Sequence, residues 1–113
     1  MFVDWNDYER VHADRRNLLN HLLAVPLFVI ALPVALISVA RGEWILAAVS
    51  VLAAIGSTVL QGFGHAKEAN QPKPFNSLLN FLQRWLSEQY FQFPVFLITG
   101  RWWRQYKTAG IST

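Results

Sequence analysis

Two long stretches without charged side chains decide the fold: LLAVPLFVIALPVALISVA at residues 22–40 and WILAAVSVLAAIGSTVL at residues 44–60. The charge-free runs around them are longer still, since no Asp, Glu, Lys or Arg occurs at residues 17–40 or 44–66. A membrane-spanning helix needs about 20 mainly apolar residues, so we predict two membrane-spanning helices. The alternative is a pair of buried helices in a soluble bundle. It fits less well, because helices of a small soluble domain need a polar face.

The connection between the two stretches predicts their relative orientation. Only Arg41, Gly42 and Glu43 join them, so the helices are expected to form an antiparallel hairpin. Basic residues gather around its open end: Arg10, Arg15, Arg16, Lys67, Lys73 and Arg84. At the tip, Arg41 is offset by Glu43. The positive-inside rule therefore places both termini in the cytoplasm, in a bacterial inner membrane or an ER-like membrane.

The segments on either side of the hairpin have the pattern of short amphipathic helices. Residues 2–13 carry aromatic side chains at helical spacing, and residues 76–92 have an apolar side and a polar stripe. Pro94 is expected to end or bend the second segment. Residues 101–107 form a basic aromatic tail suited to the headgroup level of a bilayer. We therefore predict an all-α integral membrane protein. It is a helical hairpin of two spans flanked by interfacial amphipathic helices, forming a single domain over residues 1–113.

The composition agrees with a membrane protein and excludes several classes of function. Hydrophobic residues make up 53% of the 113 residues and charged residues 15%, whereas an average soluble domain has roughly 25% charged residues. No cysteine occurs, which excludes a disulfide scaffold, a thiolate zinc site and a cysteine nucleophile. The formal net charge of +3 is too small to argue for nucleic acid. We expect no nucleic-acid partner, because a membrane anchor accounts for the basic aromatic tail.

Three histidines, His12, His21 and His65, lie where the chain enters and leaves the two spans. A hairpin brings these positions to one face of the membrane, where neutral imidazoles could bind a metal ion. On one straight helix, His12 and His21 would point to opposite sides and stand about 13 Å apart, so a shared ion requires a break between them. Asp14 is a candidate N-cap of the first span, which places the break at Ala13 and Asp14. The alternative is that each histidine is an interfacial residue with a hydrogen-bonded ring.

Two acids are candidates to complete such a site. Glu68 follows His65 by three residues and would share its helical face. Glu88 either contributes a carboxylate to the site or pairs with Arg84, four residues earlier. Histidines with one carboxylate resemble the ligand set of non-haem iron, which leaves positions open for oxygen and substrate. A closed structural zinc site is the alternative.

Two motifs surround these residues. The first reads HADRRNLLNHLLAVP at residues 12–26 and follows the pattern His-x-Asp/Asn-x-x-Asn-x-x-x-His-x-x-x-x-Pro. The second reads QGFGHAKEANQP at residues 61–72 and follows Gln-x-x-Gly-His, then a nearby Glu and a Pro. With a hairpin between them, the pair resembles the membrane dioxygenases typified by the yeast enzyme of phytosphingosine metabolism to odd-numbered fatty acids. The resemblance covers about residues 8–104.

The resemblance implies an Fe(II)-dependent enzyme that oxidises a 2-hydroxy fatty acid with O2 and shortens it by one carbon. It implies that three histidines and one acid bind or adjoin the iron: His12, His21, His65 and Glu68. The family often places this acid four residues after the histidine, whereas here it is three. Further residues are expected to orient these ligands or to contact the substrate: Asp14, Asn17, Gln61 and Glu88. Cations that could attract the substrate carboxylate are Arg15, Arg16 and Lys67.

Two other classes of function remain open at this point. A non-catalytic membrane module that binds lipid or a protein partner would use the three histidines for stability only. A metal-dependent hydrolase would turn over without oxygen. The expected partners of the dioxygenase are a membrane lipid or 2-hydroxy fatty acid and O2.

Overall fold

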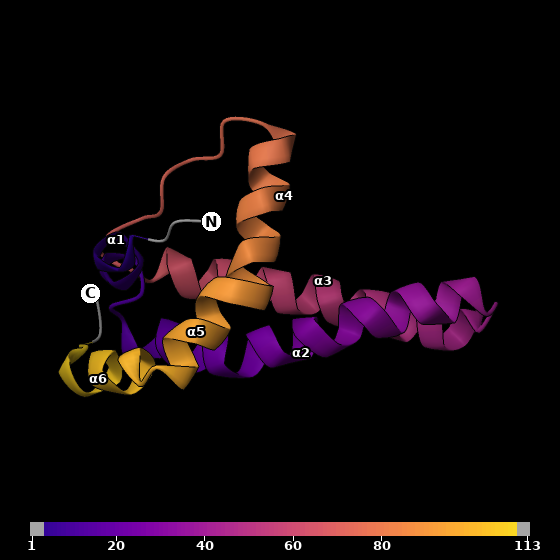
Figure 1. Ribbon diagram of the computed structural model, residues 1–113, viewed down its shortest axis with the longest axis horizontal. Helices are drawn as coiled ribbons and strands as arrows, with labels where there is room; N and C mark the ends of the chain where they lie inside the picture. Colours follow the sequence, from indigo (N-terminus) through magenta and orange to yellow (C-terminus); the bar gives the residue numbers. More distant parts are fainter. Residues whose placement is uncertain (1–3, 111–113) are drawn as a thin grey trace.

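The computed structural model describes residues 4–110, and the chain in that range is helical apart from its connecting segments (Figure 1). In chain order, the elements are α1 (Trp5–Arg10), α2 (Arg15–Ala40), α3 (Trp44–Ala66), α4 (Leu78–Ser87), the π-helical turn η1 (Glu88–Gln92), α5 (Phe93–Ile98) and α6 (Arg101–Thr108). The predicted all-α class is confirmed for these residues. Residues 2 and 3 of the predicted N-terminal helix lie outside the described range, as do both ends of the expected domain.

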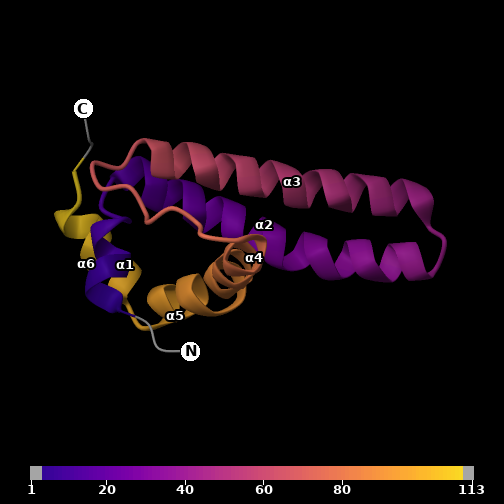
Figure 2. The same cartoon turned by 90° about the horizontal axis from the view of Figure 1, so that it is seen from above.

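Helices α2 and α3 are long and apolar enough to cross a membrane, with 26 and 23 residues. They lie side by side and antiparallel, and residues 41–43 join them at one end (Figure 2). Large apolar side chains cover their outer surfaces; Ile45, for example, is 85% exposed and Ile30 is 65% exposed. The structure buries only 33% and 22% of their most apolar windows. This low burial disfavours the soluble bundle, whose central helices would be mostly covered.

Small residues line the contact between α2 and α3. Ala31 of α2 is buried there, as are Ala47 and Ser50 of α3. The Ser57 hydroxyl of α3 donates a hydrogen bond to the Ala24 carbonyl of α2. Small side chains let two helix backbones approach closely without a hydrophobic driving force. The pairing of α2 and α3 therefore rests on close backbone packing.

The apolar core lies at the open end of this helix pair, where both ends of the chain return. Its members are Tyr8, Leu18, Val25, Phe93, Phe96 and Trp102. The indole Nε1 of Trp102 in α6 donates to the Leu18 carbonyl at 3.0 Å. Helices α1, α5 and α6 thus gather at the open end, while α4 projects away from the helix pair (Figures 1 and 2).

The segment expected as one helix over residues 76–92 consists of α4 followed by the π-helical turn η1. Pro94 has no backbone N–H, so it cannot continue the α-helical bonding pattern. The Phe93 N–H instead donates to the Glu88 carbonyl, five residues earlier. The helical path therefore continues past Pro94 into α5. Such π turns occur frequently at functional sites, and this one begins with Glu88.

Candidate metal centre

Four side chains from four parts of the chain meet at the open end of the helix pair. His12 follows α1, His21 lies in the second turn of α2, His65 lies in the last turn of α3, and Glu88 begins η1. The structure has the break expected between the first two histidines, because α1 ends at Arg10 and Asp14 is the N-cap of α2. The Asp14 side chain accepts a hydrogen bond from the Arg16 N–H at 2.8 Å. This break lets His12 turn back toward His21.

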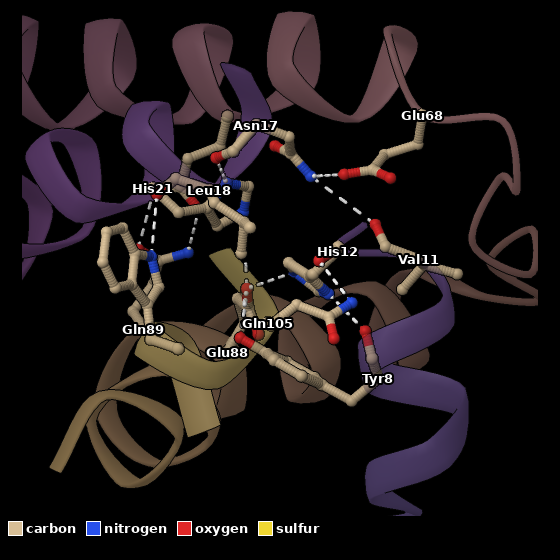
Figure 3. Close-up of polar contacts among 12 residues, drawn as sticks. Tyr8, Val11, His12, Asn17, Leu18, His21, Glu68, Glu88, Gln89 and Gln105 are labelled. Carbon is tan, nitrogen blue, oxygen red and sulfur yellow. Dashed lines mark hydrogen bonds and ion pairs between the residues drawn. The ribbon is translucent and has the colours of Figure 1, made fainter. Parts of the chain in front are cut away.

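The four side chains are close enough to share one ligand. One potential donor atom from each of His12, His21, His65 and Glu88 lies within 4.8 Å of the others. The ring centroids of the three imidazoles are 4.7–5.1 Å apart. Glu88 Oε1 lies 3.2 Å from His12 Nε2 and 3.4 Å from His21 Nε2 (Figure 3). The histidines that the sequence predicted to share one face therefore do lie together.

Backbone carbonyls orient the imidazole rings, and the ring of His65 has its own hydrogen bond with the Val11 backbone. Nδ1 of His12 lies 2.7 Å from the Tyr8 carbonyl oxygen, and Nδ1 of His21 lies 3.1 Å from the Asn17 carbonyl oxygen. Carbonyls only accept hydrogen bonds, so each Nδ1 carries a hydrogen, while each Nε2 faces Glu88 Oε1. Such outer hydrogen bonds fix the tautomer and direction of metal-binding histidines. Both Nε2 atoms are thereby presented to the centre of the group.

Two nitrogen atoms of the group lack a hydrogen-bond partner in the described part of the chain. His21 Nε2 and His65 Nδ1 are buried and make no hydrogen bond within residues 4–110. Buried polar atoms are normally paired, so these two atoms are suited to bind a metal ion. Two atoms on opposite sides of one ion, each about 2.1 Å from it, lie at most about 4.2 Å apart. A metal ion would need only a small contraction of the group, so the residues fit a divalent transition-metal ion.

Comparison with known families identifies the chain. Residues 3–93 match the family model described as 2-hydroxy-palmitic acid dioxygenase Mpo1-like. The chain belongs to this family. The resemblance carried by the two motifs is thus confirmed, and the family description implies dioxygenase activity. No curated protein and no solved structure matches the chain significantly.

The match places the whole candidate centre inside the family region. It includes the three histidines and Glu88, whereas α6 lies beyond its end at residue 93. The candidate metal centre is therefore built from segments that lie within the family match. Helix α6 hydrogen-bonds to the segment that carries His12 and lies outside the matched region.

Glu88 is the carboxylate that faces the imidazoles. Burial acts to raise the pKa of Glu88, but the adjacent His12, through its charge and its hydrogen bond, lowers that pKa to about 2. The carboxyl group is therefore ionised at neutral pH. The Tyr8 hydroxyl donates to Glu88 Oε1 at 3.2 Å. Burial, and next the charge of Glu88, raise the pKa of Tyr8 well above its ordinary value, so the phenol keeps its proton and remains a donor.

Glu68 occupies a different place from the one expected. Its carboxylate accepts from the backbone N–H groups of Ala13 at 2.8 Å and Asp14 at 3.0 Å. It also accepts from the Asn17 side-chain amide at 2.7 Å. Among residues 4–110, the group of potential metal ligands has Glu88 as its acid and does not include Glu68. The buried Glu68 therefore stabilises the segment that joins α1 to α2.

Asp14 and Asn17 lie beside the metal centre. Asp14 caps α2 and pairs with Arg16 at 2.9 Å. Asn17 presents its backbone carbonyl to His21 and its side chain to Glu68. Both residues thus organise the start of α2, which carries His21.

Gln61 forms a buried pair with Gln89, a residue that the sequence analysis did not single out. Gln61 Nε2 donates to Gln89 Oε1 at 2.8 Å, and Gln89 Nε2 donates to Gln61 Oε1 at 2.7 Å. The only signal in the sequence is an uncharged polar residue next to Glu88. That signal is weak, because the same pattern is common on exposed helix faces.

Two other contributors were also missed. Tyr8 lies four residues before His12, stacks on its ring with centroids 4.0 Å apart and donates to Glu88. Gln105 of α6 donates to the carbonyls of Glu9 at 2.8 Å and His12 at 3.1 Å (Figure 3). The helical spacing of Tyr8 and His12 was a usable signal for the first contact. Nothing local indicates the second, since Gln105 is 93 residues from His12.

The cations proposed to attract a substrate carboxylate have other contacts. Arg15 donates to the Tyr106 carbonyl at 3.1 Å and lies over the Tyr106 ring. Arg16 pairs with Asp14. Lys67 is exposed at the end of α3. In this structure, the two arginines therefore tie α2 to its surroundings.

Proposed function

We propose that this chain is an integral membrane, Fe(II)-dependent dioxygenase that converts 2-hydroxy fatty acids into fatty acids one carbon shorter. One observation carries the proposal. In a member of a dioxygenase family, His12, His21, His65 and Glu88 converge at the open end of two apolar helices. The unpaired nitrogens of His21 and His65 are what a resident metal would satisfy.

The lengths of α2 and α3 support a membrane location. At about 1.5 Å per residue they extend about 39 and 35 Å, against a hydrocarbon core of about 30 Å. We place the tip outside and both termini in the cytoplasm, with α4 and α6 at the interface. His21 and His65 lie near the ends of their helices, so the site would lie at the boundary between lipid and headgroups. A fatty acid could then react while its acyl chain stays in the bilayer.

The proposed reaction balances as R–CH(OH)–COOH + O2 → R–COOH + CO2 + H2O. The bond between C1 and C2 breaks, C1 leaves as CO2, C2 becomes the new carboxyl carbon, and O2 is reduced. Bound Fe(II) would supply the redox chemistry toward O2 and coordination for the substrate hydroxyl and carboxylate.

The residues of the chain have separate duties in this proposal. His12, His21, His65 and Glu88 would hold the metal, and the Tyr8 and Asn17 carbonyls keep two of the rings aimed at it. Tyr8 also donates to Glu88 and so limits the directions its carboxylate can take. Buried Leu18, Phe93 and Phe96 exclude water from this end of the molecule.

The test is turnover by purified protein. The chain would be purified anaerobically in detergent, loaded with Fe(II), and given 2-hydroxypalmitic acid with and without O2. We expect a fatty acid one carbon shorter, detected by mass spectrometry, together with O2 uptake. The shortened acid cannot form without an oxidant, so turnover of an ester or amide lipid in the absence of O2, with no shortening of 2-hydroxypalmitic acid, would favour the hydrolase alternative. Absence of both product and bound iron would overturn the proposal.

Matched variants separate catalysis from membrane folding. His65→Ala should abolish turnover and reduce bound iron, whereas Arg41→Ala, at the exposed tip of the helix pair, should leave both unchanged. If His65→Ala changed only stability, the non-catalytic membrane module would be the better description.

A further inference from the structure

The hydrogen-bonded pair of Gln61 and Gln89 takes no part in the steps of the proposed reaction. The two amides are almost completely buried, with exposed fractions of 6% and 1%. An amide has both donor and acceptor atoms, so two amides can satisfy each other by exchanging hydrogen bonds. Burying them without that exchange would be costly. Apolar side chains would fill this buried space without needing partners, so a role other than packing is to be sought in the neighbours of the two amides.

The pair belongs to a short hydrogen-bond network that joins three elements. Gln61 Nε2 also donates to the Ser57 hydroxyl at 3.1 Å, and Ser57 in turn donates to the Ala24 carbonyl. The network thus runs from η1 through α3 to α2. Side-chain networks of this kind stabilise one arrangement of the elements when all members are satisfied.

Both ends of the pair adjoin the metal centre. Gln61 lies four residues before His65 on α3, so the two share a helix face. Gln89 directly follows Glu88 in the π turn. The carboxylate of Glu88 needs an accurate position, because Oε1 contacts His12 at 3.2 Å and lies 3.4 Å from His21. A contact that holds η1 against α3 therefore also sets the distance between Glu88 and the imidazoles.

The π turn needs such an external contact. Pro94 follows directly and supplies no backbone N–H, and the turn is closed through the Phe93 N–H. Isolated π turns are rare and appear mostly as single turns within α-helices. The Gln61–Gln89 pair provides a contact from outside the turn, at the residue next to Glu88.

We propose that Gln61 and Gln89 are positioning residues that hold the π turn against α3 and so aim the Glu88 carboxylate at the three histidines. This inference rests on the proposed metal centre and deepens it. The two amides are satisfied by each other, so the pair would act through the neighbouring Glu88. Removing it should weaken metal binding and change the coordination geometry while the helices remain folded.

Cobalt binding tests this without measuring turnover. Co(II) would be titrated into the detergent-solubilised full chain under chelator competition, and its visible absorption would report the coordination number. Gln61→Leu and Gln89→Leu should each weaken Co(II) binding about tenfold, as expected for residues that orient metal ligands, and alter the absorption band. The matched control is Gln83→Leu, on the exposed part of α4, which should leave both unchanged.

The double variant Gln61→Leu/Gln89→Leu separates positioning from stability. It leaves no unpaired amide, so its melting temperature should recover toward that of the unmodified protein. Its Co(II) affinity and spectrum should remain altered. Recovery of affinity and spectrum together with stability would overturn the proposal, as would unmodified affinity in both folded single variants. An unmodified protein that binds neither Co(II) nor Fe(II) would instead overturn the metal centre itself, and this inference with it.

Discussion

At the scale of single residues, the buried Glu68 and the partly buried Glu88 have different roles. Glu68 accepts hydrogen bonds from two backbone N–H groups and one amide, whereas Glu88 faces two imidazoles and a phenol. Their surroundings differ because the break between α1 and α2 exposes backbone donors that need an acceptor. Glu68 meets that need, and Glu88 is the acid of the proposed metal centre.

Exchanging each glutamate for glutamine should separate these duties. Glu88→Gln removes the charge that faces the imidazoles, so metal affinity should fall at least tenfold. Glu68→Gln replaces charge-assisted hydrogen bonds by weaker ones, so the free energy of unfolding should fall by about 1.5–3 kcal/mol. Chelator competition and unfolding in detergent measure the two effects. The opposite pattern, with metal lost only in Glu68→Gln, would return Glu68 to the ligand set.

Gly64 allows another residue-scale test, because it is the point where α3 approaches the start of α2. A Cβ built there would lie 2.3 Å from Asn17 Oδ1 and 3.3 Å from the Asn20 side chain. The Asn17 amide cannot move away freely, since it donates to Glu68. Gly64→Ala should therefore destabilise the protein by about 1–3 kcal/mol, measured by unfolding in detergent.

Gly56→Ala is its matched control. Within residues 4–110, nothing lies within 4 Å of a Cβ built at Gly56. Replacing a helical glycine by alanine without a clash stabilises by about 0.4–1 kcal/mol. Equal effects at the two glycines would contradict the close approach of α2 and α3 at Gly64.

At the scale of elements, the C-terminal helix α6 contacts the N-terminal segment that carries His12. Gln105 donates to the carbonyls of Glu9 and His12, where α1 ends, and Trp102 donates to the Leu18 carbonyl. The Glu9 carbonyl also accepts from the His12 backbone N–H at 3.2 Å, so Gln105 adds a contact from a distant element to the turn that ends α1. Helix α6 therefore fixes the segment from which His12 projects.

Gln105→Glu should loosen that segment, because a carboxylate cannot donate and would repel both carbonyls. We expect a loss of about 1–3 kcal/mol in stability and a severalfold weaker metal affinity. Hydrogen exchange of residues 9–13 should increase, while exchange in α3 should not. Unchanged exchange at residues 9–13 would argue that α6 covers this end without positioning His12.

At the scale of the whole molecule, the proposed topology separates the tip of the helix pair from the metal centre by the thickness of a bilayer. The chain has no cysteine, so single introduced cysteines can report each side. In spheroplasts of a bacterial host, an impermeant maleimide should label Glu43→Cys at the tip. It should label Lys73→Cys, between α3 and α4, only after the membrane is opened. Labelling of both in intact spheroplasts would contradict two spans.

Much of this architecture could be predicted from the sequence, because apolar length and charge distribution are local properties. The two spans and the break at Asp14 follow from stretches of fewer than 30 residues. The division of the segment after Asn76 could not be predicted in this way. Pro94 can end a helix or be accommodated by a π turn, and the local sequence fits both outcomes.

The sequence by itself determined the helical class, the two long apolar helices, the family and the gathering of His12, His21 and His65. All of these depend on hydropathy, on motif spacing, or on the connection of three residues between the spans. Only the tertiary structure decided that Glu88, and not Glu68, faces the imidazoles, and that Gln89, Tyr8 and Gln105 surround the site. The physical reason is that a carboxylate with little exposure to water is stable only where hydrogen-bond donors surround it. Here the donors come from α1, from the segment after it and from α2. These are distant in sequence from Glu68 and Glu88 and meet them only when the chain packs.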